Sequence, residues 1–291
     1  MRTGKRIEIT ARDIAIFRAL ARYRYVRSTY LHAFAGGLSE TRFKERLGDL
    51  FHEGFIDRPE RQWEFAGARY MPAVCEIGER AERVLAELDG HKIDASTFLA
   101  ASAHRQFAHS LLICECLASI ELAVATKPDL RFIPWPEIMG RAPQSTRTSA
   151  TSFRIPVTSG AVIPDGFFGL EYRSEGKSAY RFFALEVDRG TMPVMRSREG
   201  QTSYFGKIAA YREIIARKLH KSHLGVPNLF VLTVTTDPQR LSDILAKLGP
   251  HESNPLFLFK IVDARALTMP APGLLTEPWE RAGLPPLRID E

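Results

Sequence analysis

The chain has 291 residues, of which 45% are hydrophobic and 25% are charged, and this length suits two domains or one large domain. The three cysteines are an odd number without the spacing of a zinc site, which argues against a disulfide framework or a structural zinc. The basic N-terminus is not followed by an apolar signal core, and the longest apolar stretch contains two glutamates. We therefore expect a reduced, cytoplasmic protein without a membrane partner.

Positive charge is concentrated at the N-terminal end. The formal net charge is +6, and residues 1–46 contain eleven Lys and Arg against four Asp and Glu. An excess of this kind is typical of proteins with a polyanionic partner, although a solvated basic surface is the simpler alternative.

Three short helices are predicted within residues 10–54. Thr10 and Asp13 have the spacing of a capping box, and apolar residues recur behind them at helical spacing up to residue 23. Ser28 can cap a second helix that ends at Gly36, and Ser39 can cap a third over residues 40–53.

Two extended pieces, 55–58 and 63–72, follow the third helix, and a further helix is predicted over 76–88. Three helices and a hairpin are the element order of a winged helix-turn-helix, in which the third helix enters the major groove of DNA. Lys and Arg would neutralise phosphates there. The expected DNA-binding residues are Arg42, Lys44 and Arg46 on the third helix, and Arg58, Arg61 and Arg69 around the hairpin. The alternative is a small helical domain that binds protein.

The remaining residues predict a helix followed by a mixed α/β layer. Residues 97–125 are apolar nearly all round, so we expect a buried helix, interrupted by Glu115 and Glu121. The tail from Met269 carries five prolines and is expected to wrap the surface. Strands are predicted at 130–134, 153–157, 161–171, 180–188, 228–236 and 256–263, and helices at 202–219 and 238–248.

Acidic residues interrupt two of these apolar strands. Side chains alternate along a strand, so Glu186 and Asp188 share a face, and a tight hairpin near residues 175–178 would bring Asp165 beside them. Carboxylates that converge at the end of a sheet repel one another, and a hard divalent cation such as Mg²⁺ would relieve the repulsion.

The acidic motif resembles the core of PD-(D/E)xK nucleases, with Pro164-Asp165 followed by Glu186-x-Asp188 and a helix that carries Lys207 and Tyr211. Together with the N-terminal helices, the phrases "TARDIAIFRAL", "RLGDLFHEGFIDR", "IPDGFF", "ALEVDRGT" and "KIAAYRE" resemble the replication-relaxation family of plasmids and mobile elements. The resemblance covers about residues 8–262. It implies an α+β protein with a winged helix-turn-helix over 1–90, a restriction-endonuclease-like domain over 97–268 and a tail over 269–291.

The resemblance also implies roles for single residues. Asp165 and Glu186 would bind Mg²⁺ with the backbone carbonyl of Val187, and a glutamate of the preceding helix, Glu115 or Glu121, would assist. The motif expects a lysine where this chain has Asp188, which cannot orient water in the same way. Lys207 is expected to supply the ammonium group, with Tyr211 on the same helical face. Alternatively, Asp188 pairs with Arg189 or Arg198 and the site is inert.

Two functions follow from these expectations. The first is a Mg²⁺-dependent endonuclease or nickase that acts on double-stranded DNA selected by the winged helix. The second is a non-catalytic regulator of transcription or replication, whose nuclease-like domain serves dimerisation or binds replication or transfer proteins. A homodimer is expected in either case, since helix-turn-helix proteins commonly read two half-sites. A sugar- or nucleotide-processing enzyme lacks support, because no glycine-rich phosphate loop and no nucleophile motif is present.

Overall fold

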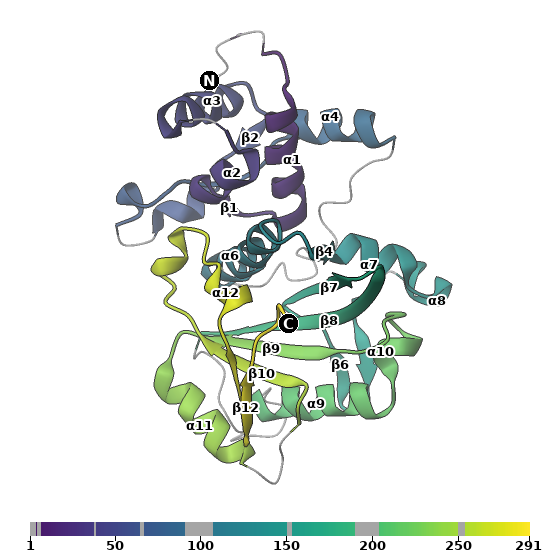
Figure 1. Cartoon of the computed structure of the whole chain (residues 1–291). Helices are drawn as coiled ribbons and strands as arrows, with labels where there is room; N and C mark the ends of the chain where they lie inside the picture. The colour runs from purple at the N-terminus through teal and green to yellow at the C-terminus, as the bar shows by residue number, and fades with distance from the viewer. Residues whose placement is uncertain are drawn as a thin grey trace. The chain divides into compact units, whose positions relative to one another are not determined.

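The computed structural model describes residues 4, 7–37, 39–64, 67–90, 107–149, 153–189, 204–249 and 254–291 (Figure 1). Helices occur together with a seven-stranded mixed sheet, so the predicted α+β class is confirmed. The chain divides into two compact units. Unit 1 comprises Met1–Leu122 and Ala264–Pro272, and unit 2 comprises Ala123–Asp263 and Gly273–Glu291. These boundaries differ from the predicted domains, because the apolar helix and a short stretch near residue 269 belong to unit 1.

Unit 1 begins with three helices, and a short strand lies between the first and the second. Its elements are α1 (Ala11–Tyr23), β1 (Val26–Arg27), α2 (Ser28–Ala35), α3 (Glu40–His52), β2 (Ile56–Asp57), η1 (Glu60–Glu64), η2 (Ala68–Tyr70), β3 (Val74–Ile77), α4 (Glu79–Asp89), most of α6 (Phe107–Val124) and η4 (Ala266–Thr268).

Local signals set the ends of these helices. The side chain of Thr10 accepts a hydrogen bond from the backbone of Asp13, whose carboxylate bonds back to Thr10, so the predicted capping box is present. Ser39 caps α3 through the backbone N–H of Arg42. The turn before it contains Gly36 and Gly37, both with positive φ, a conformation that side chains with a Cβ adopt with strain.

Strands β1, β3 and β2 form a three-stranded sheet in this order. The prediction of an extended segment over 63–72 is wrong, because this stretch contains 3₁₀ turns and the second hairpin strand starts only at Val74. The buried side chain of Gln62 explains the difference. Its amide accepts from the N–H of Val74 at 2.9 Å and donates to the carbonyl of Val74 at 3.2 Å, and so it replaces a ladder partner.

The apolar helix α6 is buried as predicted for its described part, and residues 97–106 lie outside the described residues. Its length and composition would allow it to cross a membrane, but 78% of the stretch is buried in the structure, which is typical of a core helix. In unit 1 it packs with Val74 through Phe107 and Leu111.

Unit 2 is built around one mixed sheet of order β12-β11-β10-β9-β8-β7-β4. Strands β8, β9 and β10 are parallel to one another, and the other pairs are antiparallel. Its elements are β4 (Leu130–Pro134), α7 (Trp135–Arg141), α8 (Gln144–Arg147), β5 (Ile155–Val157), β6 (Gly160–Val162), β7 (Gly166–Ser174), β8 (Lys177–Asp188), α9 (Tyr204–Ala216), α10 (Leu219–Ser222), β9 (Phe230–Thr235), α11 (Pro238–Leu248), β10 (Phe257–Ile261), α12 (Gly273–Thr276), β11 (Trp279–Arg281) and β12 (Leu284–Leu287).

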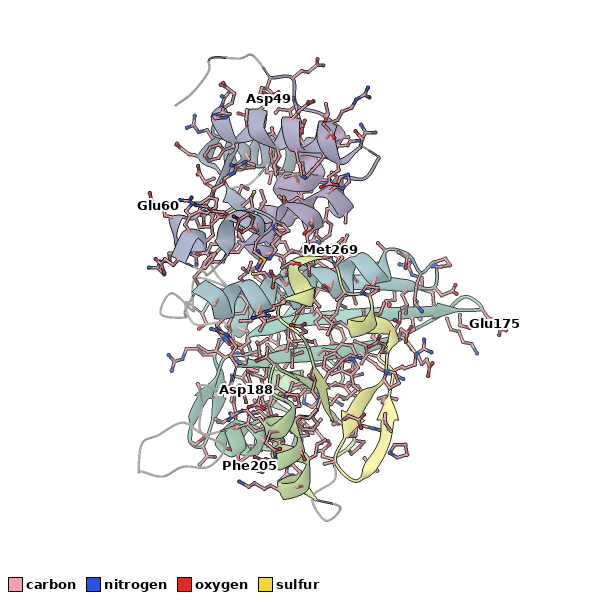
Figure 2. The ribbon with its side chains drawn as sticks, turned by 90° about the vertical axis from the view of Figure 1, so that its left-hand side faces the viewer. Asp49, Glu60, Glu175, Asp188, Phe205 and Met269 are labelled. Carbon is pink, nitrogen blue, oxygen red and sulfur yellow. The ribbon has the colours of Figure 1, made fainter. Side chains whose placement is uncertain are left out.

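The predicted hairpin joins β7 and β8 at Glu175 and Gly176, which have φ of 48° and 76°. Two consecutive positive φ values are typical of the two-residue turns that match strand twist. The register pairs Gly166 with Leu185, so Asp165, just before β7, comes opposite Glu186. The hairpin turn and the carboxylates thus lie at opposite ends of β8, as Glu175 and Asp188 show in Figure 2.

From its prolines, the C-terminal tail was expected only to wrap the surface, but it also forms two strands. Its residues form β11 and β12, which extend the sheet beyond β10, and Trp279 is fully buried. Pro285 and Pro286 lie on β12, the edge strand, between the residues that pair with β11, where the register shifts and neither proline has a ladder partner.

Candidate functional site

The predicted DNA-binding residues on α3 divide into two kinds. Arg42 and Lys44 are exposed, and Lys44 forms a 2.6 Å ion pair with Glu40 one turn earlier. Arg46 instead turns inward, where its guanidinium donates to the buried carboxylate of Asp13 at 2.6 and 3.0 Å. Burial alone would raise the pKa of Asp13, but the bonds from Arg46 and Thr10 lower it. Arg46 therefore holds α3 against the start of α1.

The arginines around the hairpin divide in the same way. Arg61 and Arg69 are exposed. Arg58 is half-buried, with its guanidinium 4.6 Å from the ring centre of Phe51, and its Nε is buried without a hydrogen-bond partner. A cation held over an aromatic ring contributes to packing as well as to charge.

The acidic motif forms a compact group at one end of the sheet of unit 2. Asp165 and Glu186 are both buried, and Asp165, just before β7, lies opposite Glu186 on β8. One oxygen of Asp165 accepts from the backbone N–H of Val187 at 2.9 Å, which fixes the carboxylate against β8. The structure therefore brings the two predicted metal ligands together on one sheet face.

Helix α9 supplies the partners of these carboxylates. The ammonium group of Lys207 donates to one oxygen of Glu186, and the hydroxyl of Tyr211 donates to the other. The same ammonium group lies 4.0 Å from Asp165. Residues four apart share a helical face, so the predicted pairing of Lys207 and Tyr211 at the site is observed.

Burial dominates the electrostatics of Glu186. Removal from water raises the pKa of this carboxyl, Lys207 and Tyr211 lower it, and the negative charge of Asp165 raises it, so that the pKa is about 7. Glu186 therefore changes its charge near neutral pH. A carboxyl group with such a pKa can take up or release a proton under the conditions in which most enzymes work.

Asp188 does not join this pair. It is buried and forms an ion pair with Arg240 on α11, which is buried as well. Sequence reasoning named Arg189 or Arg198 as partners, of which Arg198 lies outside the described residues. The only local feature that could have drawn attention to Arg240 is its place in the first turn of α11, a helix capped by Asp237. The contact spans 52 residues of sequence, so no spacing rule could have found it.

Tyr204 is another residue that sequence reasoning did not include. Its hydroxyl donates to Thr233 on β9 at 2.8 Å, and the residue is buried. Thr233 is the register partner of Glu186, so Tyr204 fixes the start of α9 beside the site. It positions the helix that carries Lys207.

The two glutamates of α6 have partners within unit 1. Glu115 is buried and pairs with Arg27, while Glu121 accepts from Arg22 and from the hydroxyl of Tyr23. The expectation that one of them assists the acidic pair is thus not supported by their contacts, since both serve to attach α6 to the first helices. His104 lies outside the described residues, and His109 lies on α6.

In the described part of the chain, no group of three or more His, Cys, Asp or Glu side chains is placed to hold a metal ion. The predicted three-carboxylate cluster is therefore reduced to the pair of Asp165 and Glu186. Mg²⁺ is nevertheless commonly bound through one or two carboxylates, with water and substrate phosphate as its other ligands. The donor chemistry of the pair fits such an ion.

A family model described as replication-relaxation matches residues 17–229, which is more than half of the chain. The chain belongs to the replication-relaxation family. The residues that match the family model start within α1 and end just before β9, so they include α3, the acidic pair and Lys207. Membership indicates a role in the replication of a plasmid or mobile element. No curated protein and no solved structure matches the chain.

Proposed function

We propose that this family member binds double-stranded DNA through unit 1 and acts in the replication or transfer of a plasmid or mobile element, as a cytoplasmic homodimer. The observation that carries the proposal is the outward face of α3. The inward face is buried through Phe43, Leu47 and Leu50, while Arg42 and Lys44 point to solvent on the opposite side. A helix packed in this way presents cations to a groove without disturbing its own core.

The inward position of Arg46 supports the proposal that the opposite face of α3 is turned toward DNA. Its pair with Asp13 connects α3 to the capping box of α1, so the recognition helix is attached to a rigid neighbour. A helix held at a fixed angle can enter the major groove with little loss of conformational freedom on binding.

A salt titration of DNA binding tests this assignment. In the Arg42→Ala, Lys44→Ala double variant, we expect weaker binding and a log–log salt slope that is smaller by roughly 2, since each lost phosphate contact removes about one released counterion. Arg83→Ala is the matched control, because Arg83 forms an exposed i,i+4 pair with Glu79 on α4, as Lys44 does with Glu40 on α3. An equal effect of both variants would contradict a specific role for α3.

A second candidate function is Mg²⁺-dependent cleavage of DNA by unit 2. The observation that favours it is Lys207, whose ammonium group contacts Glu186 and lies near Asp165. These three side chains supply the two carboxylates and the amine of the nuclease motif, with the amine coming from a helix instead of the strand. Asp165, Glu186 and the carbonyl of Val187 would hold the ion.

Each residue of this chain would have a separate task. A bound Mg²⁺ would polarise a phosphate oxygen and lower the pKa of the attacking water. Lys207 would stabilise negative charge that develops on the phosphate. Tyr211 holds Glu186 in place, and Asp188 fixes Arg240 at the end of β8 instead of taking the part of the motif lysine.

Cleavage and metal binding can be measured separately. We expect Mn²⁺ to bind the wild-type protein in titration calorimetry, and Asp165→Ala to abolish both this binding and any nicking of supercoiled plasmid. Lys207→Met is expected to slow nicking while metal binding persists. DNA binding without cleavage, across Mg²⁺ and Mn²⁺, would favour the regulator, in which unit 2 serves dimerisation or binds replication or transfer proteins.

A further inference from the structure

The segment between β2 and β3 exposes large apolar side chains. Tyr70, at the end of η2, is 95% exposed, and Met71 beside it is 40% exposed. Trp63 on η1 is 52% exposed. Single exposed apolar residues are ordinary, but several exposed in one segment are typical of an interaction surface.

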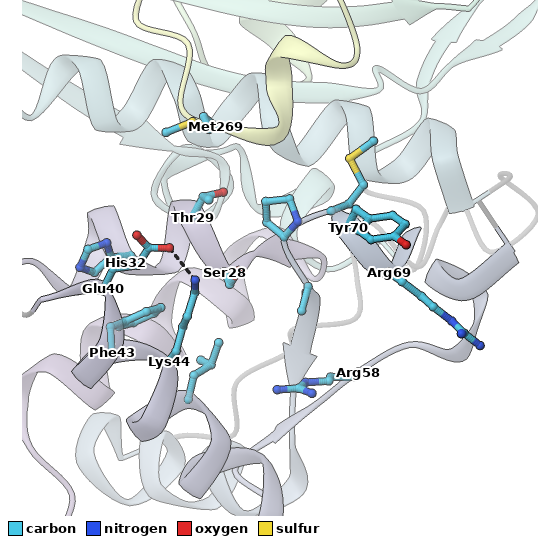
Figure 3. A pocket seen from close by; sticks show the side chains of 14 residues that line it. Ser28, Thr29, His32, Glu40, Phe43, Lys44, Arg58, Arg69, Tyr70 and Met269 are labelled. Atoms are coloured by element: carbon cyan, nitrogen blue, oxygen red, sulfur yellow. Dashed lines mark ion pairs between the residues drawn. The ribbon is translucent and has the colours of Figure 1, made fainter. Parts of the chain in front are cut away.

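Tyr70 and Met71 lie on the border of a cleft of about 670 Å³ within unit 1 (Figure 3). The far side of the cleft is α3, which contributes Phe43, Lys44 and Leu47. The exposed tyrosine thus stands across the cleft from the helix that is expected to enter the DNA groove.

The charge around the cleft is positive. Lys44, Arg58 and Arg69 line it against a single carboxylate, Glu40, which is already paired with Lys44. Trp63 is different, since it does not line the cleft and lies on η1, where Glu60 and Glu64 outnumber the single cation Arg61. A polyanion therefore complements the surroundings of Tyr70 better than those of Trp63.

We infer that the cleft takes a DNA strand with unpaired bases, and that Tyr70 stacks on one of these bases next to the duplex held by α3. An aromatic ring with cations on both sides is the usual combination for single-stranded nucleic acid, because the ring stacks on any base and the cations follow the phosphates. Arg69 and Arg58 would contact the backbone on either side of the stacked base. The ligand is then a junction between double-stranded and single-stranded DNA, and the inference rests on the proposed DNA binding of unit 1.

Binding of two DNA probes tests the inference: a blunt duplex, and the same duplex with an oligothymidylate tail. Anisotropy should show that the tail strengthens binding by the wild-type protein. Tyr70→Ala should weaken binding of the tailed probe by roughly fivefold to a hundredfold, the range measured for loss of one stacked base. Its binding of the blunt duplex should change by less than about twofold. Tyr70→Phe retains the ring and should behave as the wild type does.

Trp63→Ala is the matched control, because it removes an exposed aromatic ring from the same segment, outside the cleft. No effect on the tailed probe is expected from it. The Arg42→Ala variant separates the two proposals, because Arg42 lies on α3 but does not line the cleft. It should weaken blunt-duplex binding and keep the ratio between tailed and blunt probes. A wild-type protein that binds both probes equally, or a Tyr70→Ala variant that retains the full preference for the tail, would overturn the inference. Equal losses for Tyr70→Ala and Trp63→Ala would do so as well, because they would indicate an apolar protein-binding surface.

Discussion

Glu115 in unit 1 and Glu186 in unit 2 are both buried glutamates beside a cation, and burial raises the pKa of each to about 7. Their surroundings differ. Glu115 faces Arg27, which also donates to the carbonyl of Pro72, and this pair joins α6 to the first helices. Glu186 faces Lys207 and Tyr211 and has a second carboxylate, Asp165, within reach of the same ammonium group.

The comparison shows that a shifted pKa by itself does not identify a site. One carboxylate with one cation is neutralised and has no charge left for a ligand. At Asp165 and Glu186 two buried carboxylates lie within reach of the same ammonium group, and buried carboxylates are expensive unless cations or protons compensate them. The second carboxylate distinguishes the candidate site from the structural pair.

The largest effect is expected from removal of the cation in the structural pair. Arg27→Ala leaves Glu115 buried without a partner, and the free energy of unfolding should fall by about 3–5 kcal/mol. Urea unfolding followed by circular dichroism measures this loss. Arg18→Ala is a suitable control, since Arg18 pairs with Asp89 at the surface and its loss should cost at most about 1 kcal/mol. Similar losses in the two variants would show that the burial of the Arg27 pair is unimportant.

The next effect concerns pH. Burial raises the pKa of Glu115 and of Glu186 from the usual 4.5 to about 7. Between these values the folded state binds more protons than the unfolded chain, so stability is greatest below pH 4.5 for these groups and falls as the pH rises through 7. Each group should account for a fall of about 3 kcal/mol at most.

Urea midpoints at pH 5 and pH 7.5 check this direction. Glu186→Gln and Glu115→Gln should each reduce the difference between the two midpoints, because a glutamine cannot release the proton. If Mn²⁺ is added, only the wild type and Glu115→Gln should regain stability at pH 7.5. Recovery of Glu186→Gln as well would place the bound ion somewhere other than the candidate site.

The smallest effects are expected on α3, which forms one ion pair with a buried carboxylate and another at the exposed surface. Arg46→Ala removes hydrogen bonds to the buried Asp13 and should cost about 1.5–3 kcal/mol. Lys44→Ala removes an exposed pair with Glu40 and should cost less than about 0.5 kcal/mol, while it weakens DNA binding. Thermal unfolding together with the salt titration separates the two roles. If Lys44→Ala destabilised the protein as much as Arg46→Ala, Lys44 would be a structural residue.

Several features of the fold could be predicted because they depend on neighbours in the chain. The capping box of Thr10 and Asp13 and the cap at Ser39 follow from spacings of three residues. The strand periodicity placed Glu186 on a defined face, and the turn at Glu175 and Gly176 then set the register that brings Asp165 opposite to it. A hairpin is a local structure, so its register follows from the turn.

The hairpin of unit 1 was placed incorrectly for the opposite reason. Val74 takes its hydrogen bonds from the side chain of Gln62 instead of from a strand, and propensity gives no sign of such a replacement. The tail was expected to be a surface segment because of its prolines, yet it forms an edge strand in which Pro285 and Pro286 lie at a register shift.

The sequence by itself determined which residues carry charge into apolar segments, and therefore that Asp165, Glu186 and Lys207 were worth following. Only the tertiary structure decided which carboxylates remain together. Asp188 shares a strand face with Glu186 but is neutralised by Arg240, and Glu115 is neutralised by Arg27. The physical reason is that the cost of a buried charge is set by the groups that surround it in space, and these come from elements far apart in the chain.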